Sequence, residues 1–164
     1  MVSKLGVDGA IAELRTYHDY PGYDYYTMGS DRINIYDKEI THNGQPNSRN
    51  VGADCSSFVY AYLSLVFCKT MNVGDTETLY NDLVKLGYQH ISANENWDAK
   101  KGDIFIWSTN GKGPSAGANG HTGVFINDKL MLNSNYGHDG IYIDDYNEIW
   151  NLITPYVDVY RKVV

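Results

Sequence analysis

The sequence DCSSFVYAYLSLVF, residues 54–67, decides the fold class of this chain. It begins with polar residues and continues with almost unbroken apolar ones, a pattern typical of a capped helix that is largely buried. Asp54 or a neighbouring serine is placed to cap the N-terminus of this helix. Cys55 is therefore expected at a helix N-terminus, where the positive end of the helix dipole stabilises a thiolate.

Helices are expected on both sides of this stretch. The first twenty residues repeat apolar side chains at helical spacing. A shorter amphipathic helix is expected over residues 75–86, with Gly87 placed to end it. Residues 20–53 and 108–120 show no regular period and are expected to be loops.

From Lys100 onward the pattern changes to short strands bounded by turn residues. These strands are expected at residues 104–107, 122–126, 130–135, 141–143 and 156–161. Helices first and strands later predict an α+β domain, with helices packed on a mainly antiparallel sheet.

Size and charge exclude several classes of function. The chain has 164 residues, a length typical of one compact domain. Its formal net charge is −7 and its basic residues are scattered, so neither nucleic acid nor an anionic membrane surface is an expected partner. No apolar stretch approaches the roughly 18 residues that a membrane span needs, so membrane insertion is not expected. The N-terminus lacks the apolar core of a signal peptide.

The two cysteines, Cys55 and Cys68, are expected to be free thiols. If the segment between them is helical, a rise of about 1.5 Å per residue separates them by roughly 20 Å, whereas a disulfide needs Cα atoms within about 7 Å. Cys68 is flanked by apolar residues and is expected to be a buried, inert thiol. Neither a metal site nor a cofactor is expected, and the Asp144-Asp145 pair is interpreted as a solvated turn.

His121 is the candidate base for a cysteine nucleophile. It opens the apolar segment Thr122-Gly123-Val124-Phe125-Ile126, so its side chain can point from a sheet edge toward a helix terminus. The other histidines fall in helix-end or loop positions by sequence, and a catalytic role is not expected for them. They are His18, His42, His90 and His138.

Asn133 and Asn135 are candidates for a third group that orients the imidazole. If Ile126 opposes Leu130 across a three-residue turn, these two asparagines share one face of the sheet with His121. A two-residue turn would put both of them on the other face. Asn133 is the first choice and Asn135 the reserve.

Three separate blocks carry a resemblance to a known family. They are DCSS at residues 54–57, WDAKKGDIFIW at 97–107 and SAGANGHTG at 115–123, followed by NSNY at 133–136, DG at 139–140 and YR at 160–161. In this order and spacing, the chain resembles the bacteriophage peptidoglycan hydrolases of the NlpC-like, papain-fold superfamily. It is most similar in pattern to the amidase domain at the front of streptococcal and related phage endolysins. The resemblance implies a papain-like fold with the nucleophilic cysteine at a helix N-terminus.

The resemblance also assigns catalytic roles. It implies that Cys55 is the nucleophile, that His121 is the base and that Asn133 orients His121. Many members of the family carry histidine where Asn133 stands, and the chain is longer than the family pattern over residues 33–51.

A second set of residues is implied for substrate binding or the oxyanion hole. Asp54 resembles a position that binds the substrate's amine or backbone. Tyr26 resembles a tyrosine whose hydroxyl joins the Cys55 backbone N–H in an oxyanion hole. Ser57 and Asn135 complete this expected set.

The expected activity is hydrolysis of an amide bond in bacterial peptidoglycan, with N-acetylmuramoyl-L-alanine amidase as the preferred form. The alternatives are a γ-D-glutamyl(glutaminyl)-L-lysine endopeptidase of the same family, a protein-directed cysteine protease and a non-catalytic wall-binding module. We expect residues 1–164 to be a single, monomeric catalytic domain, either isolated or the N-terminal part of a longer endolysin. Made in the host cytoplasm without a signal peptide, it would reach the cell wall through a holin or lysis.

Overall fold

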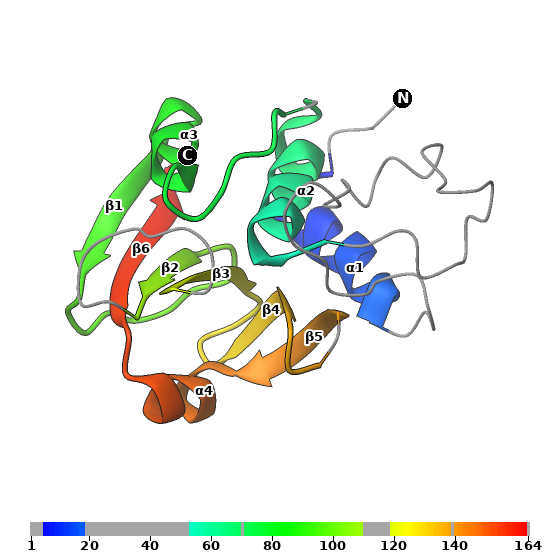
Figure 1. Ribbon diagram of the computed structural model, residues 1–164. Helices are drawn as coiled ribbons and strands as arrows, with labels where there is room; N and C mark the ends of the chain where they lie inside the picture. The colour runs from blue at the N-terminus through cyan, green and yellow to red at the C-terminus, as the bar shows by residue number, and fades with distance from the viewer. Residues whose placement is uncertain (1–4, 19–52, 70, 110–118, 139, 164) are drawn as a thin grey trace. The chain divides into compact units, whose positions relative to one another are not determined.

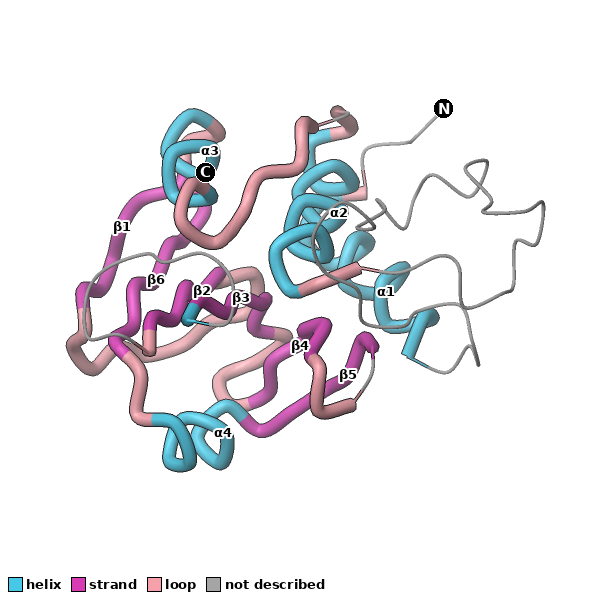
Figure 2. The backbone as a smooth tube through the Cα atoms, in the orientation of Figure 1, coloured by secondary structure: helices cyan, strands magenta, loops and turns pink. Residues whose placement is uncertain are grey.

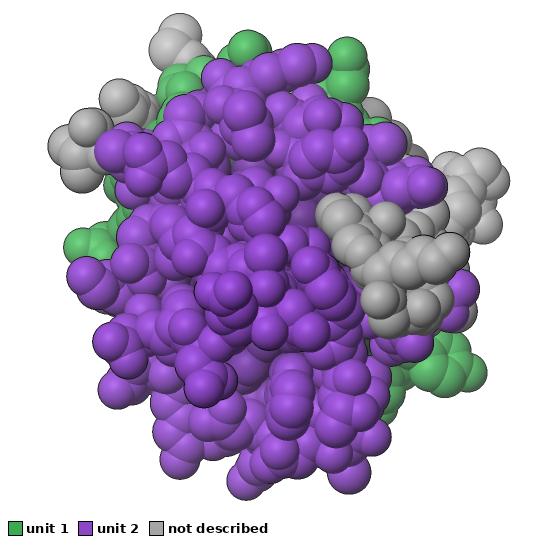
Figure 3. Space-filling view, turned by 90° about the vertical axis from the view of Figure 1, so that its left-hand side faces the viewer, with its two compact units in different colours: residues 1–73, 133–143 green, residues 74–132, 144–164 purple. Residues whose placement is uncertain are grey.

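A computed structural model describes residues 5–18, 53–69, 71–109, 119–138 and 140–163 (Figures 1 and 2). The chain divides into two compact units, which Figure 3 colours separately. Unit 1 comprises residues 1–73 and 133–143, and unit 2 comprises residues 74–132 and 144–164.

Unit 1 is built on two helices, α1 (Gly6–His18) and α2 (Cys55–Phe67), which lie side by side in Figure 1. Every residue of α2 from Cys55 to Val66 is buried. Such a helix has no face for solvent and is stable only when its whole circumference is covered. The predictions of α1 and of a buried α2 are confirmed.

Unit 2 contains the antiparallel ladders. Its elements are α3 (Leu79–Lys85), β1 (Tyr88–Ala93), β2 (Ile104–Ser108), β3 (Gly120–Phe125), α4 (Tyr146–Ile153) and β6 (Tyr156–Lys162). Two more strands, β4 (Leu130–Asn135) and β5 (Gly140–Asp145), each run from one unit into the other. The strand order is β1-β6-β2-β3-β4-β5, so the predicted α+β class with an antiparallel sheet is confirmed.

The turn between β3 and β4 sets the register of this hairpin. Phe125 pairs with Met131, and the Ile126 N–H donates to the Leu130 carbonyl at 2.9 Å. The side chain of Asn127 closes the turn by accepting the Leu130 N–H at 2.7 Å. The three-residue turn is therefore confirmed, and the even register is wrong for this chain.

Several predictions about local structure are wrong. Strand β1 was not expected, because its residues are mostly polar or exposed and a bulge interrupts its pairing with β6. Helix α3 begins at Leu79, since Asp75 caps a separate turn by accepting the Thr78 N–H at 3.0 Å.

The Asp144-Asp145 pair is not a solvated turn. Asp144 is only 9% exposed. The Asp145 carboxylate caps α4 by accepting the N–H groups of Asn147 and Glu148 at 3.0 and 3.2 Å. The Glu148 N–H, more than any other group, lowers the pKa of Asp145, because it stabilises the charged form. Burial opposes this effect, and the nearby Lys129 adds to it.

An ion pair between the buried Asp103 and the partly exposed Arg161 fixes the start of β2. Asp103 is fully buried and receives two hydrogen bonds from Arg161, from Nε at 2.8 Å and from a terminal nitrogen at 2.7 Å. The same carboxylate accepts the Lys100 N–H at 2.9 Å, and Arg161 also donates to the Asp98 carbonyl. The side-chain hydrogen bonds to Asp103 raise the pKa of Arg161. One carboxylate thus joins β6 to the turn that precedes β2.

We expect Asp103→Ala to lower the free energy of unfolding by about 1–3 kcal/mol, because Arg161 and the Lys100 N–H lose their buried acceptor. Lys129→Ala is the matched control: it breaks the Lys129–Asp145 pair, in which Lys129 is 65% exposed, and should cost less than about 1 kcal/mol. Urea denaturation of the full chain measures both. Equal losses would contradict the structural role of Asp103.

Candidate functional site

The N-terminus of α2 is capped by side chains of the same segment, Asp54 and Ser57. Asp54 is the N-cap, with extended backbone, and its carboxylate accepts the Ser57 N–H at 2.9 Å. In return, the Asp54 N–H donates to the Ser57 hydroxyl oxygen at 2.9 Å, which completes a capping box. The hydroxyl of Ser56 donates to the same carboxylate at 3.1 Å. The first turn of α2 is therefore held in one conformation.

Cys55 is the first residue of α2, as predicted, and its side chain is buried, with 7% exposure. This position places the thiol at the positive end of the helix dipole. Cys68 lies at the other end, where it is the C-cap in left-handed conformation (φ 51°). Both cysteines are free thiols, as expected, but Cys68 is exposed and its predicted burial is wrong. The helix ends at Phe67, which turns Cys68 out of the buried segment.

Asp54 and Ser57, expected to bind substrate, have a structural task in the capping box. Ser57 is fully buried and Asp54 is 8% exposed. Direct contact of either side chain with substrate stays a prediction.

Asn133 and Asn135 form a hydrogen-bonded chain at the end of β4. The Asn135 amide donates to Asn133 Oδ1 at 3.0 Å, and the Asn133 amide donates to the Tyr142 carbonyl at 3.1 Å. Asn135 Oδ1 in turn accepts the His138 N–H at 2.8 Å. Asn133 is fully buried, so this chain fixes the orientation of its amide.

Ser134 ties β4 to the residue that precedes the cap of α2. Its hydroxyl donates to the Ala53 carbonyl at 2.7 Å, and both residues are buried. Unit 1 therefore holds the strand end with Asn133 next to the chain segment that leads into Cys55. Sequence reasoning missed Ser134, although a serine between two candidate asparagines in an apolar strand was a usable signal.

His121 belongs to unit 2, in β3 opposite Trp107. Its partly exposed imidazole lies beside two aromatic rings, with centroid distances of 6.0 Å to Phe105 and 5.6 Å to Trp107. These rings restrict the orientations open to the imidazole. Unit 1 brings together Asp54, Cys55, Ser57, Asn133 and Asn135, whereas the pairing of His121 with Cys55 stays a prediction.

Other sequence-predicted positions fall elsewhere. Tyr26 and His42 lie outside the described residues. His90 is in β1, where its Nε2 lies 2.8 Å from Asp158 Oδ1, so its predicted loop position is wrong. Within the described residues, no three His, Cys, Asp or Glu side chains are grouped so that they could hold a metal ion. In the same part of the chain, no helix is long and apolar enough to cross a membrane.

Solved structures share the fold. The crystal structure of the NlpC/p60 domain of the peptidoglycan hydrolase SagA superposes with a TM-score of 0.52 and 16% sequence identity, covering 94% of this chain and 97% of that chain. NlpC1 from Trichomonas vaginalis gives a TM-score of 0.57 at 16% identity, covering 95% of this chain and 43% of that chain. The fold is thus of the NlpC/p60 type.

Sequence comparison reaches closer relatives. A lysin of Pneumococcus phage Dp-1 is 44% identical over 110 residues, which are 66% of this chain and 36% of that protein. The chain therefore spans about a third of the length of that relative. The family described as bacteriophage peptidoglycan hydrolase matches residues 28–164, most of the chain. The chain belongs to this bacteriophage peptidoglycan hydrolase family.

Proposed function

We propose that this chain is a cysteine-dependent peptidoglycan hydrolase and, more narrowly, an N-acetylmuramoyl-L-alanine amidase. Membership of the family supports hydrolysis of peptidoglycan. The observation that carries the cysteine mechanism is the Ser134–Ala53 hydrogen bond, which holds the strand end with Asn133 against the segment entering Cys55. The resemblance to phage amidase domains favours the sugar-to-peptide bond.

Cys55 is the proposed nucleophile. The first N–H groups of a helix have no partners within the helix, and together with the helix dipole they stabilise a thiolate. The capping box fixes the backbone at Cys55, so the Cα–Cβ bond that carries the sulfur keeps one direction. Such pre-organisation lowers the entropy lost on reaching the transition state.

His121 is the proposed base, and Asn133 the residue that orients it. Side chains alternate along a strand, so Asn133 lies on the same face of β4 as Met131, and His121 on the same face of β3 as Phe125. Because Phe125 and Met131 are cross-strand partners, the observed register supports this assignment. Asn133 Oδ1 accepts a hydrogen bond from Asn135, and an amide oxygen can accept more than one hydrogen bond.

The proposed reaction has two steps. The Cys55 thiolate attacks the amide carbonyl carbon, and protonated His121 gives its proton to the leaving amine as the carbon–nitrogen bond breaks. Water, deprotonated by His121, then attacks the thioester and releases the carboxylate and the thiolate. Neither step requires a metal ion.

The remaining assignments belong to the same proposal. Tyr26 is proposed to join the Cys55 N–H in the oxyanion hole. Both units are proposed to act as one monomeric catalytic domain, since the family match runs through both. The site of action is proposed to be the bacterial cell wall, reached through a holin or lysis.

Digestion of purified Gram-positive peptidoglycan, with mass spectrometry of the fragments, tests the activity. The wild type is expected to release stem peptides that begin with L-alanine, because amidase cleavage frees that amine. Cys55→Ala is expected to lose about a thousandfold in rate or more, because it lacks the nucleophile. Cys68→Ala removes the exposed thiol and should cleave at the wild-type rate.

Other outcomes have defined meanings. Fragments that end at D-glutamate or D-glutamine would identify the γ-D-glutamyl(glutaminyl)-L-lysine endopeptidase instead. Undiminished cleavage by Cys55→Ala would rule out the cysteine mechanism. If the wild type cleaves none of several types of peptidoglycan, the chain is not a hydrolase, and a non-catalytic wall-binding function remains as the alternative.

Alkylation by iodoacetamide tests the state of the thiol. In the Cys68→Ala protein, Cys55 is expected to react at nearly the same rate from mildly acidic to neutral pH, because its thiolate is already formed. An ordinary thiol, with a pKa of about 8.5, instead reacts about tenfold faster per pH unit. Cys68 in the Cys55→Ala protein is the exposed reference. If Cys55 reacts only after unfolding, it is an inert buried thiol and the proposal fails.

We expect Asn133→Ala to lower kcat about 10- to 100-fold with little change in KM, because a misplaced imidazole costs rate and not binding. Asn133→His should restore most of the loss, since its ring can also accept the imidazole N–H. Tyr136→Ala, at an 83% exposed position just after β4, is the control for general disturbance. Rates are compared well below each unfolding temperature. Equal kcat values for Asn133→Ala and Tyr136→Ala would exclude an orienting role.

A further inference from the structure

Unit 2 contains a cavity of about 370 Å³, and none of the described residues proposed for catalysis or substrate binding lines it. We call it the α4 pocket: it is bounded by α4 and by residues of the 94–99 segment after β1, and its buried lining includes Phe125, Tyr146 and Val157. Ligand pockets in proteins measure about 300–1,000 Å³. The α4 pocket is therefore large enough for a small ring compound and too small for a long peptide segment.

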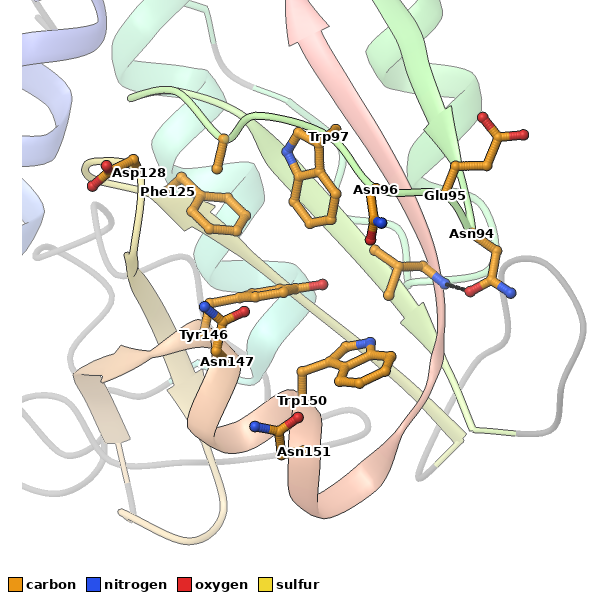
Figure 4. Close-up of a pocket in the computed structure, with 12 residues that line it drawn as sticks. Asn94, Glu95, Asn96, Trp97, Phe125, Asp128, Tyr146, Asn147, Trp150 and Asn151 are labelled. Atoms are coloured by element: carbon orange, nitrogen blue, oxygen red, sulfur yellow. Dashed lines mark hydrogen bonds between the residues drawn. The ribbon is translucent and has the colours of Figure 1, made fainter.

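Two half-buried tryptophans form the apolar walls. Figure 4 shows Trp97 and Trp150 on opposite sides of the pocket, from the 94–99 segment and from α4. Trp97 is held edge-on by Phe125 and Tyr146, at centroid distances of 5.7 and 5.5 Å and interplanar angles of 82° and 87°. Rigid indole rings of this kind offer flat apolar surface for the C–H face of a sugar ring.

The polar lining consists mainly of amides, contributed by Asn94, Asn96, Asn147 and Asn151. The Asn94 side chain accepts the Val157 N–H at 3.2 Å and so supports the wall. Asn96 and Asn151 are exposed, and the buried Nε1 of Trp97 has no hydrogen-bond partner among the described residues. Amides both donate and accept, which suits hydroxyl and acetamido groups.

The charge of the lining selects against anions. Glu95 and Asp128 are exposed members of the lining, and none of the described lining residues is a lysine, arginine or histidine. A phosphate or a peptide carboxylate would meet repulsion from these two carboxylates, and the lining offers no cation to compensate it. A neutral ligand meets no such penalty.

We propose that the α4 pocket binds an uncharged N-acetylated sugar residue of the glycan strand. The proposal rests on peptidoglycan as the substrate and extends it, because it separates glycan recognition from the residues that act on the amide. Binding here holds the polymer on the enzyme and lowers the KM for intact wall without a direct effect on kcat.

Binding of tri-N-acetylchitotriose to the full chain carrying Cys55→Ala tests the pocket without any cleavage. The chain has three tryptophans, so the NMR spectrum contains three indole N–H signals. The signals of Trp97 and Trp150 are expected to shift with the sugar. Trp107, which is 1% exposed and bonded to the Tyr146 hydroxyl, should shift least and reports that the fold is intact.

Matched variants localise the effect. Trp150→Ala should weaken binding about tenfold or more, because it removes one wall of the pocket. Leu152→Ala is the control on the same helix: Leu152 is 82% exposed and does not line the pocket, so binding should be unchanged. Equal affinities of these two variants would overturn the proposal, as would the absence of indole shifts at millimolar sugar.

Two further ligands test the chemistry. Cellotriose lacks acetamido groups, and binding as tight as that of the acetylated sugar would refute recognition of the N-acetyl group. Shifts of Trp97 and Trp150 with the tripeptide L-Ala-γ-D-Glu-L-Lys and not with the sugar would assign the pocket to the peptide and overturn the proposal. Sugar binding is measured on inactive protein, so a failed cleavage assay and a failed binding assay are separate results.

Discussion

The proposed site depends on one constraint, the capping of the N-terminus of α2 by Asp54. A helix buried on every side cannot leave the N–H groups of its first turn to bulk water. The Asp54 carboxylate and the Ser57 hydroxyl satisfy part of this need within the same turn. The fold therefore fixes the residue that follows the cap, and that residue is Cys55. The capping that burial of the helix requires thus also fixes the position of the proposed nucleophile.

One aromatic cluster in unit 2 supports two functional features. Trp107 pairs across the sheet with His121, and its indole N–H donates to the Tyr146 hydroxyl at 3.0 Å. Tyr146 in turn lines the α4 pocket and packs against Trp97. Burial raises the pKa of Tyr146 above its usual range, so the hydroxyl stays neutral at physiological pH. The proposed base and the proposed sugar pocket thus share a rigid core.

The sequence predicted features whose signals are local and strong. The buried helix with Cys55 at its start and the odd register across Asn127 both followed from patterns that a few neighbouring residues determine. Helix α4 was not predicted, although Asp145 is a regular N-cap, because two adjacent acidic residues are also typical of a solvent-exposed turn. Strand β1 lies at the edge of the sheet and shows no clear alternation, because half of its residues are exposed and the buried ones do not alternate with them. The α4 pocket is lined by the missed helix α4 and by the segment that follows the missed strand β1, so no sequence pattern could have predicted that Trp97 and Trp150 line one pocket.

With an asparagine in the proposed orienting position, the protein has to hold the orienting group in place by hydrogen-bond geometry. A charged histidine or carboxylate at that position would form a stronger, charge-assisted hydrogen bond with the imidazole. The hydrogen bond of a neutral amide has no such contribution and depends on its geometry. Asn133 is held from both ends, by the Asn135 amide at its oxygen and by the Tyr142 carbonyl at its nitrogen. The amide cannot flip without breaking both hydrogen bonds in a fully buried place, which would leave polar groups without partners at a cost of about 1–3 kcal/mol each. Asn135, the reserve candidate of the sequence analysis, restrains the Asn133 amide through this hydrogen bond, as the proposed orienting role requires.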